Sequence, residues 1–173
     1  LLGSDVNVVA ATPPAGQAIG LIRAHFEAAT GGGSCAATPP ARPTISMAFN
    51  PAYLSNAGGT TRITISIGNT NSDNLIVQAA ALTLPASVTN SAVPNAVTNC
   101  RNAADTGTAA VTAAGGGAVI GLPASSLIPP GGCTISVDVI AQPGSYSIVL
   151  RASDFLTSSG LPVGDASDRK SVV

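Results

Sequence analysis

Residues 60–80 read TTRITISIGNTNSDNLIVQAA, and this stretch decides the fold. Its first half places an isoleucine at every second position, Ile63, Ile65 and Ile67, with one polar residue between each pair. A β-strand points successive side chains to opposite faces, so the isoleucines are expected to face a core and the polar residues to face water. Residues 68–74 then supply turn formers, and an apolar run resumes at Leu75. The simplest prediction is two strands joined by a polar turn, a hairpin.

The composition limits the class of protein. A chain of 173 residues fits one domain, or one domain with an arm, and an apolar fraction of 45% suffices for a core. The charged fraction is only 9%, where average domains have roughly 25%. A net charge of −1 without a basic run argues against nucleic acid as a partner. No apolar run reaches the roughly 18 residues of a membrane-spanning helix, so we expect no membrane insertion.

Strand and turn signals recur every 8–15 residues or so, which predicts an all-β fold and a β-sandwich. The clearest further strands are expected at residues 44–49, 134–140 and 145–152, and a closing strand at 167–173. Residues 89–107 are interpreted as a loop, and two short strands are expected at 109–112 and 118–122. Tyr146 follows the turn at residues 142–144, a position typical of the tyrosine corner in Greek-key sandwiches.

The chain contains three cysteines, Cys35, Cys100 and Cys133. None has the C-x-x-C spacing or the neighbouring histidine of a zinc or redox site. A disulfide between Cys100 and Cys133 is the first choice, and it would stabilise the fold by roughly 3–4 kcal/mol on the chain-entropy model. The alternative is three buried or idle thiols. A disulfide would imply an oxidising compartment, with Cys35 either free or linking two chains.

Residues 1–38 differ from the rest and are interpreted as an N-terminal arm with a Gly/Pro-rich linker, ahead of a domain at residues 42–173. Residues 5–12 alternate like a strand. Residues 18–29 fit a helix or a strand, and we favour a strand because the neighbouring segments are β. Such an arm either packs on its own sandwich or completes the sheet of a neighbouring subunit, and head-to-tail donation would build a filament. The expected interface residues of the arm are apolar: Val6, Val8, Ala10, Ile19, Leu21, Ile22 and Phe26.

The sequence contains no convincing catalytic, cofactor-binding or metal-binding constellation. His25 is the only histidine, it lies in the arm, and no G-x-S-x-G elbow accompanies it. Asp165 and Asp168 lack the dense oxygen-ligand spacing of a calcium loop. The Gly triplets at 31–33 and 115–117 lack the spacing and the lysine of a phosphate-binding loop, so we expect flexible turns there. We therefore expect no enzyme activity, no cofactor and no metal.

Five short motifs follow one another in an order that resembles a bacterial surface repeat family. The motifs are Phe49-Asn50-Pro51, Gly58-Gly59-Thr60-Thr61 with its strand ending in Asn69-Thr70-Asn71, Leu84-Pro85, the Asn99-Cys100 and Gly132-Cys133 regions, and Pro143-Gly144-Ser145-Tyr146. The family is the domain of unknown function numbered eleven, with its Ig-like relatives, and the resemblance covers about residues 42–173. The chain departs from it at Thr83, where the family often has an acidic residue, and over residues 1–38.

The resemblance implies an Ig-like Greek-key β-sandwich on an exported bacterial protein, and no catalytic residues. We accordingly expect a non-enzymatic structural subunit of an extracellular assembly on the bacterial cell surface, such as a pilus-like filament built by strand donation. Its partners would be copies of itself in a head-to-tail homopolymer, or other surface-protein domains. The alternative is an adhesin or stalk module that binds a protein or glycan. Because the chain begins with Leu1 rather than Met, we expect a processed protein or fragment from which the targeting segment has been removed.

Overall fold

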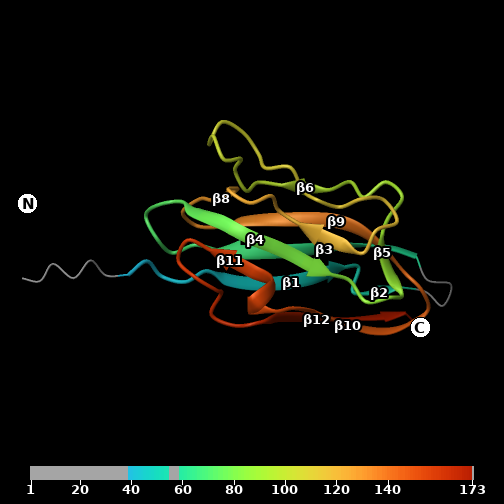
Figure 1. Ribbon diagram of the computed structural model, residues 1–173. Coiled ribbons are helices and arrows are strands. Elements are labelled where there is room, and N and C mark those ends of the chain that lie inside the picture. Colours follow the sequence, from blue (N-terminus) through green and yellow to red (C-terminus); the bar gives the residue numbers. More distant parts are fainter. Residues whose placement is uncertain (1–38, 55–58, 173) are drawn as a thin grey trace, which may run out of the picture. The chain divides into compact units, whose positions relative to one another are not determined.

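The computed structural model describes residues 39–54 and 59–172. The expectations for the arm, His25 and Cys35 lie outside these residues. The described part is a set of strands with one short 3-10 helix, which confirms the all-β prediction and the β-sandwich (Figure 1). The elements are β1 (Thr44–Asn50), β2 (Tyr53–Leu54), β3 (Gly59–Gly68), β4 (Leu75–Thr83), β5 (Val88–Asn90), β6 (Val97–Thr98), β7 (Val119–Gly121), β8 (Leu127–Ile128), β9 (Cys133–Ala141), β10 (Gly144–Leu150), η1 (Ala152–Asp154), β11 (Phe155–Thr157) and β12 (Ala166–Val172).

One layer of the sandwich is a continuous antiparallel sheet in the order β1-β3-β9-β5, with β6 also paired to β9. The register sets Ile63 between Phe49 on β1 and Val137 on β9. All three side chains are buried, because the period-2 pattern of each strand places its apolar residues on the same face. The alternation predicted for residues 60–67 and 134–140 is therefore confirmed.

The other layer is made of shorter pieces. β4 pairs with β11 on one side and with β7 and β8 on the other. The β11–β4 register shifts between Leu156 and Thr157, which marks an irregular join. A separate sheet of order β10-β12-β2 completes the layer, and β2 runs parallel to β12. The closing strand predicted at residues 167–173 corresponds to β12.

The hairpin predicted for residues 60–80 is wrong, although both of its strands exist. β3 pairs with β1 and β9, whereas β4 belongs to the opposite layer. Residues 69–74 therefore carry the chain from one sheet to the other. The physical reason is that each strand has one buried face, and two such faces can pack against each other as well as lie side by side in one sheet.

A single hydrophobic cluster fills the space between the layers. It joins β3 and β9 on one side to β4, β10 and β11 on the other, with Ile63, Val137, Val77, Ile148 and Phe155 among its most buried members. The core is mainly aliphatic. Phe155 is one of its few large rings.

Two predictions for the connecting segments need correction. Residues 89–107 are not all loop, since β5 and β6 add to the edge of β9. Residues 109–112 do not form a strand, and only Thr112 bridges to Gly121. These elements are two or three residues long, too short to leave a periodic signal.

Candidate functional site

The predicted disulfide is present. Cys100, just after β6, is bonded to Cys133 at the start of β9, and both residues are buried. The bond closes a loop of 33 residues and ties the edge of the first sheet to its central region. The alternative of idle thiols is therefore wrong for these two cysteines.

The acidic side chains of the described residues form no metal centre. Within residues 39–54 and 59–172, no group of three or more His, Cys, Asp or Glu side chains could hold a metal ion. Asp165 accepts a hydrogen bond from the backbone N–H of Ala152, and Asp168 accepts one from the N–H of Phe49. Both carboxylates therefore hold the backbone in place.

The most organised polar surface lies on the outer face of the first sheet. We call it the polar sheet face and define it by three rows of side chains across neighbouring strands: Arg62 with Asp138, Thr64 with Ser136, and Ser46 with Ser66 and Thr134. These side chains alternate with the buried ones on β1, β3 and β9, so the same periodicity that builds the core also assembles this face.

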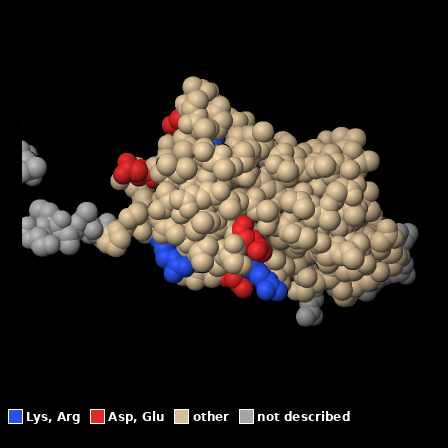
Figure 2. All heavy atoms as spheres, viewed as in Figure 1, with Lys and Arg blue, Asp and Glu red and all other residues tan. Residues whose placement is uncertain are grey.

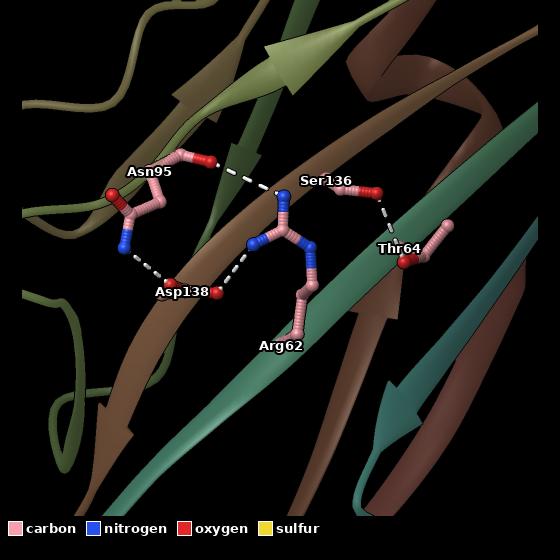
Figure 3. Close-up of polar contacts among 5 residues, drawn as sticks. All are labelled: Arg62, Thr64, Asn95, Ser136 and Asp138. Carbon is pink, nitrogen blue, oxygen red and sulfur yellow. Dashed lines mark hydrogen bonds and ion pairs between the residues drawn. The ribbon is translucent and has the colours of Figure 1, made fainter.

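Arg62 and Asp138 form the charged end of the polar sheet face (Figure 3). The Arg62 Nη1 donates to the Asp138 Oδ1 at 2.7 Å, and Nη2 donates to the backbone oxygen of Asn95 at 3.2 Å. The Asn95 side-chain amide donates to the other Asp138 oxygen at 2.8 Å. The side chains of Arg62 and Asp138 are 35% and 18% exposed, so the pair is only partly desolvated. The charges thus satisfy each other and fix the loop that carries Asn95.

The remaining rows carry hydroxyl groups. The Thr64 and Ser136 hydroxyls are hydrogen-bonded to each other at 3.0 Å (Figure 3). The Thr134 hydroxyl donates to the side-chain oxygen of Asn99 at 3.1 Å. Beside the row of Ser46, Ser66 and Thr134 lies a shallow open hollow of about 470 Å³. It is lined by residues of β1, β3 and β9 and by Asn99, Gly131 and Gly132. The hydroxyl groups of Thr64, Ser136 and Thr134 are therefore engaged in hydrogen bonds on this face.

A second polar cluster fixes the start of the domain. The buried Asn69 donates from Nδ2 to the carbonyl oxygens of Asp73 and Ile128, and its Oδ1 accepts from Asn71. Asn71 in turn accepts from the N–H of Ala41 at 2.7 Å and donates to its carbonyl at 2.9 Å. Arg42 donates to the carbonyl oxygens of residues 161 and 162. The segment that leads into β1 is therefore fixed by hydrogen bonds to the loop after β3 and to the loop before β12.

Tyr146 behaves as the sequence predicts for a tyrosine corner. Its hydroxyl lies 2.8 Å from the carbonyl oxygens of Gln142 and Pro143. The contact ties β10 to the turn before it. It does not test the Greek-key order of the strands, which stays a prediction.

Sequence reasoning did not find the Arg62–Asp138 pair or the role of Asn69 and Asn71. Arg62 and Asp138 each alternate with apolar residues in the sequence, but their contact depends on the β3–β9 register. A signal was available, because opposite charges on exposed strand faces are conspicuous in a chain with so little charge. The two asparagines were interpreted only as turn formers.

Figure 2 shows a surface on which charged side chains are few and scattered among wide uncharged areas. No helix in the described residues has the length and hydrophobicity needed to cross a membrane.

Comparison with known proteins identifies a family but no characterised relative. No match to the chain was found among curated proteins or among solved structures. A family model described as Domain of unknown function (DUF7933) matches residues 43–172. This range agrees with the domain predicted at about residues 42–173, although the family expected there was the one numbered eleven. Because the match covers most of the chain, the protein belongs to the DUF7933 family of domains of unknown function.

Proposed function

We propose that the protein is a non-enzymatic structural subunit of an extracellular bacterial surface assembly, in which the N-terminal arm of each subunit adds a strand to its neighbour and builds a filament. One observation carries this proposal. The chain divides into Pro39–Val173, which holds the sandwich core, and Leu1–Thr38, whose sequence has the strand pattern of a donated segment. Because the domain has a hydrophobic core of its own, we infer that the strand pattern of the arm serves a partner.

Two further features support an extracellular setting. The buried Cys100–Cys133 disulfide suits an oxidising compartment. The small, weakly charged surface suits a repetitive protein assembly, in which few charged groups need to be desolvated at contacts between subunits. The Ig-like, surface-repeat resemblance belongs to the same proposal.

Electron microscopy of the purified full-length protein tests the proposal. We expect filaments for the full-length chain and only single particles after deletion of residues 1–30. Cys35→Ser serves as the control that keeps the arm but removes its thiol, and it should still form filaments. Filaments that persist after the deletion would exclude strand donation, and a full-length chain that stays monomeric would overturn the filament proposal.

A second candidate is an adhesin or stalk module of a larger surface protein. The polar sheet face favours it, since the hollow beside Ser66 and Thr134 offers hydroxyl and amide groups suited to a glycan or a peptide. The absence of tryptophan and the scarcity of tyrosine weigh against sugar stacking. A glycan array probed with the full-length chain would decide the glycan form of this candidate, and an array without hits would exclude it for the sugars tested.

A further inference from the structure

We propose that the side of β10 that faces away from β12 is the acceptor site for residues 5–12 of a neighbouring copy of the chain. We call this side the β10 edge. The inference rests on the proposed function and names the surface that strand donation would use. β10 is paired on one side only, carries no charged residue or proline that would block pairing with another strand, and is about as long as residues 5–12.

Among residues 39–54 and 59–172, no strand pairs with the β10 edge anywhere along its length. β10 pairs with β12 through seven consecutive residues without a register shift, and it ends its sheet. Within the described part of the chain, no backbone hydrogen bond reaches residues 144–150 from any other segment. About half of the N–H and C=O groups of an antiparallel edge strand point away from its partner. The β10 edge therefore presents a row of free donors and acceptors.

The other edges of the described domain are occupied or short. β1 is as long as β10, but the carbonyl of Pro43 accepts a bond from Val163 N–H, and the N–H of Phe49 donates to Asp168. The outer side of β5 bonds to residues 116 and 117, and β7 is bridged by Thr112. β6 and β2 are two residues long. β12 pairs with β2 at Ser171 and Val172 and bonds to β1 through Asp168. Among the strands of seven residues or more in residues 39–54 and 59–172, β10 is thus the one whose second side receives neither a strand partner nor a side-chain bond to its backbone.

β10 also lacks the usual protection of an edge strand. Natural edges are blocked by lysine, proline, inward charges or bulges. β10 reads GSYSIVL, with no charged residue and no proline, and Val149 is 40% exposed on its outer face. The charges of this sheet are instead on the central strand, β12, which reads ASDRKSV. An open, flat and uncharged edge is a site for pairing with another chain.

Residues 5–12 fit this edge in length and pattern. They read DVNVVAAT, eight residues with one charge, beside a strand of seven. Strand addition draws its affinity from main-chain hydrogen bonds and its register from alternate side chains, and Val6, Val8 and Ala10 alternate in this way. The chain between residue 12 and the anchored Ala41 is long enough, at up to roughly 100 Å when extended, to reach a neighbouring subunit.

Cross-linking between two chains tests the assignment. Both chains carry Cys35→Ser, one carries Asn7→Cys on the face of the arm opposite to Val6 and Val8, and the other carries Ser147→Cys on the exposed outer face of β10. After mixing and mild oxidation, the Asn7→Cys chain should form a disulfide-linked dimer with the Ser147→Cys chain. The matched control is Val119→Cys, which is similarly exposed, at 41%, but lies on β7, where the neighbouring positions are already paired. We expect cross-linking to Ser147→Cys to be at least about tenfold faster than to Val119→Cys, because paired strands raise the local concentration of the two thiols.

Electron microscopy of the same proteins separates the failure of this inference from the failure of the proposed function. Filaments with equally slow cross-linking to Ser147→Cys and to Val119→Cys would show that the β10 edge is not the acceptor site, while strand donation itself would remain supported. Absence of both filaments and cross-links would overturn both. A chain that carries Asn7→Cys and Ser147→Cys together and cross-links only within itself would show that the arm closes on its own domain, which also overturns the inference. Unchanged thermal unfolding of each variant confirms that the fold is intact.

Discussion

The two layers of the sandwich are built from the same aliphatic residues, but one is continuous and the other is assembled from pieces. In the first layer, β1, β3 and β9 keep one register over their whole length. In the second, β4 meets three short strands, one pairing shifts register, and β10 and β12 form a sheet of their own. The comparison shows that a regular alternation builds a rigid sheet, whereas the irregular layer leaves a strand edge open. Three of the four predictions below set one layer against the other, and the remaining one concerns the disulfide of the first layer.

The largest expected effect is the loss of a core side chain. Ile63→Ala should lower the free energy of unfolding by about 4 kcal/mol, because Ile63 is fully buried between two long partners that cannot close the cavity. Ile148→Ala should cost less, about 2–3 kcal/mol, because β10 is an edge strand that can shift inward. Urea unfolding of the two variants measures the difference. Equal losses would mean that the second layer is as rigid as the first.

The disulfide should contribute almost as much. Replacing Cys100 and Cys133 together with alanine should lower the stability by roughly 3–4 kcal/mol, because the unfolded chain regains the freedom of the closed loop. Thermal unfolding with and without a reductant checks the result. The double variant should unfold at the same temperature in both conditions, and a remaining dependence on reductant would point to another disulfide.

Two glycines, one in each layer, lie where another residue approaches the backbone closely, so the cost of adding a side chain can be compared between the layers. A side chain at Gly121 would overlap the backbone oxygen of Ala80 on β4, so Gly121→Ala should cost about 3 kcal/mol. At Gly68, in the first layer, the overlap is with the hydroxyl of Thr44, which can rotate away. Gly68→Ala should therefore cost less than about 1 kcal/mol. Denaturant unfolding of both variants tests the contrast, which would fail if Gly68→Ala were the more harmful change.

The smallest effects concern one polar contact from each layer. Asp138→Ala removes the partner of Arg62 and of the Asn95 amide and should cost about 1–2 kcal/mol, since the site is partly exposed. Tyr146→Phe removes only the hydroxyl contact to the turn before β10 and should cost about 1 kcal/mol. Raising the salt concentration should weaken wild-type stability slightly through the Arg62–Asp138 pair and leave the effect of Tyr146→Phe unchanged. A salt-independent Asp138→Ala effect would indicate that the carboxylate acts only as a hydrogen-bond acceptor.

The sequence predicted the first layer better than the second because its signal is periodic. Residues 60–67 and 134–140 alternate without interruption, so their buried faces could be assigned before the structure was known. Pairing was not predictable in the same way, because the alternation of β3 and β4 fits either a hairpin or a crossing between layers. The choice depends on contacts distant in sequence, such as the bond from Asn69 to the carbonyl of Ile128.

The same limit applies to the candidate site. The disulfide could be proposed because only three cysteines were available and none of them has the spacing of a known metal or redox motif. The Arg62–Asp138 contact was not predicted, because the two residues are 76 positions apart and meet only through the β3–β9 register. The β10 edge could not be recognised either, since a strand looks the same in sequence whether one or both of its sides are paired.

The side-by-side arrangement of β1 and β12 has a mechanical consequence. The two strands run in the same direction, with Pro43 beside Val163 at one end and Phe49 beside Asp168 at the other. Tension between the start of β1 and the end of β12 would slide these strands past each other, so that their contacts resist together instead of opening one at a time. The anchoring of Ala41 by Asn71 would pass a pull on the arm directly into this shear. A domain loaded in this direction should yield at a higher force than one pulled across its strands, which single-molecule stretching along the two axes would measure.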